Sequence, residues 1–193
     1  MGKTQRRIFL CLISCTFLCG LIAGAISATA TDKTMTESAN PMQELRSKIF
    51  ATDPKELGLA PSKKRPHIWG VLMEIGYPEA TATLVALGEG TVSFYFSNGG
   101  GIIGAGEHMS VRNEAAKFID SSEECLDQLS PASTFPLPSE GRVRFYVLTF
   151  SGPLTVDAAE RELGEGKHPL SRLFYAGHKV ITEIRQISEP SSR

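Results

Sequence analysis

The stretch that decides the fold is residues 68–96, which read IWGVLMEIGYPEATATLVALGEGTVSFYF. Three apolar runs lie within it, at residues 68–75, 80–87 and 91–96. The third run alternates apolar with polar residues, as a half-buried strand does. Glycine-containing turns of three or four residues join the runs, and a parallel return would need about a dozen. We therefore predict a three-stranded antiparallel meander.

Two more strands and two helices are predicted downstream. Residues 142–150 (RVRFYVLTF) alternate as a strand, and residues 154–156 are expected to pair back on it. Apolar residues spaced three or four apart predict helices over 110–129 and from Pro169 onward. Asp157 and Glu160 have the spacing of a capping box. The expected buried stripes of the two helices are Val111, Ala115, Phe118, Ser122, Cys125 and Leu129, and Leu170, Leu173, Phe174, Gly177, Ile181 and Ile184.

The order βββαββα predicts an α+β domain in which helices pack on one face of an antiparallel sheet of about five strands. An N-terminal apolar leader helix precedes this domain. The order of elements is similar to that of the profilin-like group, which includes roadblock and longin modules. The likeness is one of element order alone, so it implies a fold and no site residues.

Residues 1–30 have the layout of an export signal. Three basic residues are followed by an apolar run over 8–26 and by Ser27-Ala28-Thr29-Ala30, small residues that fit a signal peptidase. The segment is either cleaved after Ala30 or retained as a signal anchor, because 19 apolar residues nearly span a bilayer. Both readings place the body outside the cytoplasm and give the chain a membrane contact through residues 8–26.

The leader also contains three of the four cysteines, so Cys125 is alone in the body and has no intramolecular partner. Cys15 lies in a lipoprotein-like pattern, which leaves lipidation there as an alternative. Beyond the leader we predict three regions. They are a polar tether with short helices and a basic loop over 31–66, a single α+β domain over 67–188, and a frayed tail over 189–193.

The charge balance argues against nucleic acid as a partner. The chain has 20 basic and 21 acidic side chains, and the body without its leader is more acidic still. Nonspecific affinity for nucleic acid rests on neutralising phosphates. We therefore expect no nucleic-acid partner.

The candidate binding site is the glycine-rich stretch 97–108, SNGGGIIGAGEH. Gly99, Gly101 and Gly104 match the spacing of a dinucleotide fingerprint, but the strands before them form a meander rather than a βαβ unit. We accordingly expect no dinucleotide and no other cofactor. The expected ligand-binding residues are Asn98, Gly99, Gly100, Gly101, Gly104 and Gly106.

Glu107 and His108 are the candidates for a catalytic site. With His168 or His178 they could form an acid/base site if the fold brings them together. The histidines have no metal-ligand spacing, so no metal site is predicted.

The sequence thus predicts an exported or membrane-tethered, non-catalytic module that binds a protein or a small ligand near residues 97–108. One alternative is a hydrolase-like enzyme that uses Glu107 and His108. Another is a structural module that forms a homodimer through an open strand edge.

Overall fold

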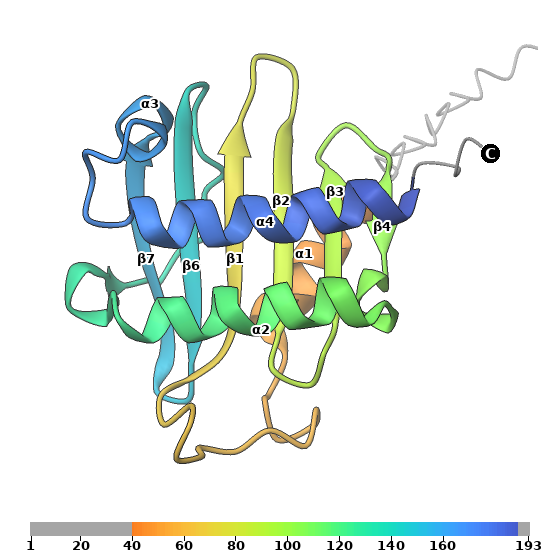
Figure 1. Ribbon diagram of the computed structural model, residues 1–193, viewed down its shortest axis with the longest axis vertical. Coiled ribbons are helices and arrows are strands. Elements are labelled where there is room, and N and C mark those ends of the chain that lie inside the picture. The colour runs from red at the N-terminus through yellow and green to blue at the C-terminus, as the bar shows by residue number, and fades with distance from the viewer. Residues whose placement is uncertain (1–39, 189–193) are drawn as a thin grey trace, which may run out of the picture. The chain divides into compact units, whose positions relative to one another are not determined.

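A computed structural model describes residues 40–188 of the protein (Figure 1). Its centre is one antiparallel sheet of seven strands in the order β4-β3-β2-β1-β6-β7-β5. The α+β class and the antiparallel sheet are therefore confirmed. The strands are β1 (Ile68–Gly76), β2 (Thr81–Leu87), β3 (Val92–Phe96), β4 (Gly101–Ile103), β5 (Ser130–Pro131), β6 (Arg142–Thr149) and β7 (Gly152–Ala159).

The predicted meander is present as β1, β2 and β3. Its register pairs Leu72 with Val85 and Thr83 with Tyr95. On its other side β1 pairs with β6, so the apolar run 68–75 is the middle strand of the sheet. A strand with neighbours on both sides and cover on both faces loses all its solvent contact, and every residue of β1 is buried.

Two helices cover one face of the sheet, α2 (Met109–Glu123) and α4 (Ser171–Ser188) (Figure 1). Both predicted stripes face the sheet and are buried, except Leu129, which is half-buried against the same core. The first helix is shorter than predicted, because the chain turns at Glu124 and continues as a short 3-10 helix, Leu126–Gln128. Cys125 is buried at this turn.

The second face of the sheet is also covered, which corrects the expectation of helices on one face only. Helix α1 (Pro41–Ala51) lies behind the sheet in Figure 1, and Ile49 is its buried residue. The apolar residues on this face that pack together are Ile49, Trp69, Leu72, Val85, Leu87, Tyr95, Tyr146 and Leu148, with Leu57, Leu59 and Phe135 among those around them. Residues 41–59 and the connection before β6 thus contribute to a second apolar layer.

The strand count also differs, with seven strands in place of about five. Strand β4 lies inside the glycine-rich stretch, and β5 is a dipeptide that pairs with β7. Strand β7 is longer than predicted and includes Asp157, so Asp157 does not cap the following helix, α3 (Glu160–Gly164). Its carboxylate instead forms ion pairs with two arginines of the neighbouring strand.

Several predictions fall on residues outside the described range. They include the apolar run 8–26, cleavage after Ala30, lipidation of Cys15 and the tail 189–193. Among residues 40–188, no helix combines the length and apolar character needed to cross a bilayer.

Candidate functional sites on the two faces and edge of the sheet

The glycine-rich stretch forms a tight hairpin between β3 and β4. The amide of Gly99 donates to the carbonyl of Phe96, and the amide of Phe96 donates to the carbonyl of Gly100. Gly99 and Gly100 have φ values of 107° and 82°, a region that glycine occupies without strain. The glycines at the tip are therefore explained by the turn itself.

The predicted ligand-binding residues occupy two different environments. Five of them are exposed at the tip and outer strand of the hairpin, namely Asn98, Gly99, Gly100, Gly101 and Gly104, whereas Gly106 is buried. At Gly106 the backbone packs directly on the carbonyl oxygen of Gly90. This position serves packing between the meander and the start of α2.

Glu107 and His108 are both exposed just before α2. His168 comes three residues before α4, and in Figure 1 α4 begins beside β7 whereas α2 begins beside β4. The Nδ1 atom of His168 accepts a hydrogen bond from the amide of Leu170, so this ring has a local structural partner. The structure thus keeps His168 apart from Glu107 and His108.

His178 lies on α4, where its ring packs edge-on against Phe174 with 4.3 Å between ring centroids. Its Nε2 atom is buried, and none of the residues that the structure describes forms a hydrogen bond with it. Burial lowers the pKa of His178, and the charge of Arg185 lowers it further. Within the described chain, no group of three or more His, Cys, Asp or Glu side chains is placed to hold a metal ion.

An apolar surface surrounds the hairpin. Within residues 40–188, β4 is the last strand on its side of the sheet. Ile103 on β4 is 60% exposed, and Met109 at the start of α2 is 67% exposed. Ile102, the neighbour of Ile103 on β4, belongs to a groove of about 290 Å³ that is lined by Phe94, Phe96, Gly101, Ile102, Ile184, Arg185 and Ser188. We refer to Ile103, Met109 and this groove as the β4 edge.

A second set of polar residues crosses the opposite face of the sheet. Strand register places five side chains in one row across five strands, in the order Tyr95, Thr83, Glu74, Arg144 and Asp157. Asp157 accepts hydrogen bonds from Arg142 and Arg144. Arg144 and Tyr146 also donate to the carbonyl of Pro136, which holds the connection before β6 against this face.

Glu74, in the middle of this row, is completely buried. Arg46 of α1 donates two hydrogen bonds to Glu74, from Nε to Oε1 at 2.5 Å and from Nη2 to Oε2 at 2.8 Å. A buried carboxylate needs such a partner, because an unpaired charge inside a protein costs several kcal/mol. The pair therefore attaches α1 to the centre of the sheet.

Tyr95 stands two strands away from Glu74 in the same row. Its hydroxyl is buried and has no hydrogen-bond partner among residues 40–188. Burial raises the pKa of Tyr95, and the negative charge of Glu74 raises it further while Arg46 opposes the rise. The hydroxyl therefore stays protonated at neutral pH.

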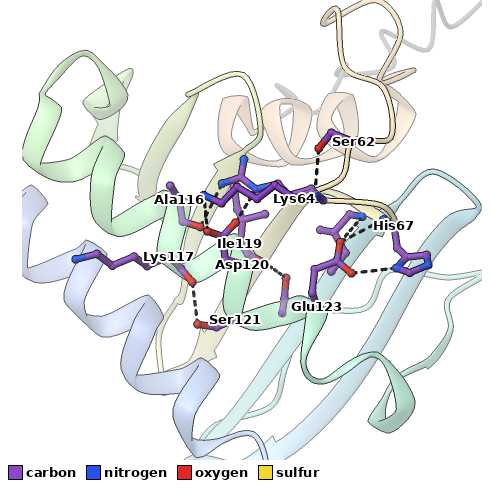
Figure 2. A network of polar contacts seen from close by, with 12 residues as sticks. Ser62, Lys64, His67, Ala116, Lys117, Ile119, Asp120, Ser121 and Glu123 are labelled. Atoms are coloured by element: carbon purple, nitrogen blue, oxygen red, sulfur yellow. Dashed lines mark hydrogen bonds and ion pairs between the residues drawn. The ribbon is translucent and has the colours of Figure 1, made fainter.

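A third polar network fixes the segment before β1, as Figure 2 shows. Lys64 and Arg65 both pair with Asp120 of α2, each at 2.8 Å. Glu123 accepts hydrogen bonds from the amides of His67 and Ile68. Part of the basic loop is thereby bound to the helix.

The sequence patterns do not predict the polar row of Tyr95, Thr83, Glu74, Arg144 and Asp157. One signal was present, since Glu74 is the only charged residue in the apolar run 68–75. A charge in such a run requires a buried counter-charge, but its identity depends on the tertiary structure. No protein-family model matches the chain, and neither a curated protein nor a solved structure matches it.

Proposed function

We propose that the protein is an exported or membrane-tethered, non-catalytic module that binds an extended apolar segment of another protein at the β4 edge. The observation that carries this proposal is an outermost strand that exposes Ile103, lies next in the fold to the exposed Met109 of α2, and contributes Ile102 to an apolar groove. The expected export rests on the leader pattern of residues 1–30.

Strand addition is the chemistry that suits this edge. The outermost strand of a sheet presents backbone donors and acceptors, and an added strand pairs with them. Alternate side chains of the added strand point to opposite faces of the sheet. One set would meet the groove beside Ile102, and the other set would lie near Ile103.

The polar groups of the opposite face support a binding role over a catalytic one. The carboxylate of Glu74 is bonded to Arg46, and that of Asp157 is bonded to Arg142 and Arg144. A general base must reach a substrate proton within hydrogen-bonding distance. The carboxylate of Glu74 instead joins β1 to α1, and that of Asp157 joins β7 to β6.

The proposal is tested with detergent-solubilised full-length protein and a display library of eight-residue peptides that alternate apolar and polar residues. We expect selected peptides to bind and to slow hydrogen exchange at the amides of 101–103. The Ile103→Glu variant should weaken this binding about tenfold or more, since a charge at the contact costs at least about 1.4 kcal/mol.

Leu137→Glu is the matched control, because Leu137 is also an exposed apolar residue but lies in the connection before β6. Both variants should retain the unfolding temperature of the original chain. The proposal is wrong if the library yields no binder, or if selected peptides bind the Ile103→Glu variant as tightly as the original protein. Self-association that is lost in Ile103→Glu, without peptide binding, would favour the homodimer instead.

A further inference from the structure

The guanidinium of Arg46 occupies a cage of a carboxylate, a carbonyl and aromatic rings. Besides its two bonds to Glu74, it donates to the carbonyl of Phe135 at 2.8 Å. Its central carbon lies 4.9 Å from the centroid of the Phe50 ring and 5.6 Å from that of Tyr146. Planar cations are bound in this way, by a paired carboxylate and by ring faces.

Most of this cage is built without α1. Glu74 comes from β1, Tyr146 from β6, and Phe135 from the connection that Tyr146 and Arg144 hold through Pro136. The hydroxyl of Thr83 donates to Oε1 of Glu74 at 3.4 Å. Phe50 is the one ring that α1 supplies, stacked on Phe135 at 4.0 Å between centroids. Removal of the Arg46 side chain would therefore leave most of its binding partners in position.

The cage is reached from the surface. A depression of about 400 Å³ is lined by Arg46, Ser47, Phe50, Ala51 and Phe135. Ser47 and Ala51 are exposed, and Arg46 retains 13% of its side-chain exposure. A small cation could therefore enter without separation of α1 from the sheet.

Besides Arg46 and the hydrogen bond from Asn40 to Ser97, helix α1 is held by apolar contacts in which Met42, Leu45 and Phe50 are only partly buried. Only Ile49 of its eleven residues is buried, whereas α4 buries seven. A helix of this length is marginally stable by itself, so its position depends on the sheet surface and on Arg46. An arginine presented by another helix with apolar residues could use the same carboxylate and the same apolar surface around Leu72 and Tyr95.

We propose that this cage is an arginine-binding site, which Arg46 fills from within the chain and which an arginine-bearing amphipathic helix of a partner protein can occupy in its place. This site lies on a different face from the groove of the β4 edge. Guanidinium is favoured over ammonium because its fork matches both carboxylate oxygens and its plane stacks on the rings. Because Arg46 belongs to the same chain, it competes with a partner's arginine at a high effective concentration. A partner helix must therefore supply apolar contacts as well.

The cage is tested in the full-length chain with Arg46→Ala and with ethylguanidinium as the probe. Removing one member of a buried pair should lower the unfolding temperature by about 10 °C. Ethylguanidinium at tens of millimolar should restore at least about half of this loss, saturably, because its binding stabilises the folded state. If Arg46→Ala does not fold alone, the yield of folded protein in ethylguanidinium is measured instead.

The matched control is the double variant Arg46→Ala with Glu74→Gln, which should not recover. Ethylammonium at the same concentration should restore less than ethylguanidinium. The arginine-binding cage is wrong if ethylguanidinium raises the unfolding temperature of both variants equally or of neither. It is also wrong if the two cations have equal effects.

The partner helix is tested in the original protein with a peptide of residues 40–51. We expect it to bind saturably and to speed hydrogen exchange of the α1 amides, whereas the R46Q peptide should do neither. Equal effects of the two peptides, or no effect of either, would overturn displacement of α1.

Discussion

Gly106 lies against the backbone of Gly90 so closely that a β-carbon at position 106 would stand 1.8 Å from the carbonyl oxygen of Gly90. A backbone atom cannot yield as the end of a side chain can. We predict that Gly106→Ala lowers the free energy of unfolding by about 3 kcal/mol or more, because the start of α2 must move away from the meander. Urea unfolding measures this loss.

Gly104→Ala is the comparison for this prediction. Gly104 has a φ of 80°, and the space that a β-carbon would occupy there is open, so alanine should cost only about 1 kcal/mol of backbone strain. Similar losses for the two variants would contradict the close packing at Gly106.

The buried pair between Arg46 and Glu74 predicts strong non-additivity. Glu74→Leu alone should cost about 3 to 5 kcal/mol, because it leaves the guanidinium of Arg46 without its counter-charge in a largely buried site. Combining it with Arg46→Leu should recover most of the loss, since two apolar side chains then fill the same space. A double-mutant cycle by urea unfolding measures the coupling, and additive losses would show that the two residues act independently.

His178 predicts a dependence of stability on pH. Burial and then Arg185 lower the pKa of His178 below its ordinary value of 6.5, so the unfolded chain binds a proton more readily than the folded one. The contribution of His178 is therefore complete above about pH 6.5, and it is lost as the pH falls through the lower folded-state pKa.

We expect His178→Phe to reduce the fall in unfolding free energy below pH 6.5, because a ring without a buried unpartnered nitrogen can still pack against Phe174. Thermal unfolding between pH 5 and 8 provides the measurement. The exposed His108→Gln variant serves as the control. If stability falls with pH as steeply in His178→Phe as in the original protein, His178 does not cause the pH dependence.

The pairing of Asp120 with Lys64 and Arg65 predicts that this carboxylate holds the segment before β1 on α2. Burial alone would raise the pKa of Asp120, but hydrogen bonds from Lys64 and Arg65 outweigh it and lower the pKa. The stabilisation is thus present at neutral pH and is lost as the pH falls below about 4. Asp120→Asn should cost about 1 kcal/mol and should speed hydrogen exchange of residues 62–66.

Lys63→Gln is the matched control for Asp120→Asn, because Lys63 is exposed and belongs to the same basic loop. It should leave exchange of the loop unchanged. Faster exchange in the Lys63 variant but not in the Asp120 variant would contradict docking through Asp120.

Alternation and spacing were sufficient to predict most of the sheet and both helices that cover its first face. On β6, Val143, Phe145 and Val147 face one apolar layer while Tyr146 and Leu148 face the other, as the alternation predicts. These patterns are local, and burial of one face per element fixes them.

The second apolar layer could also have been inferred, because the run 68–75 does not alternate. A nearly continuous apolar strand indicates that both faces are covered. Short helices are expected within residues 31–66, but the place of α1 on the sheet depends on the pairing of Arg46 with Glu74, two residues separated by 28 positions. Such pairings have no local signal.

Strand β4 is a case in which the local sequence indicates the wrong structure. Glycines flank its two isoleucines, and glycine is depleted in strands, so the local sequence indicates a loop. Pairing with β3 decides the outcome, because the hairpin brings Ile102 opposite Phe94. The apolar character of the β4 edge is therefore a product of tertiary structure.

The attachment of α1 has a mechanical consequence. Asn40 donates to the carbonyl of Ser97, and the next long-range polar link along the chain is that of Arg46 with Glu74. Tension applied through residue 40 would load these two links in turn before it reached any strand pair. Helix α1 would detach from the sheet first, while the seven strands would stay hydrogen-bonded to one another.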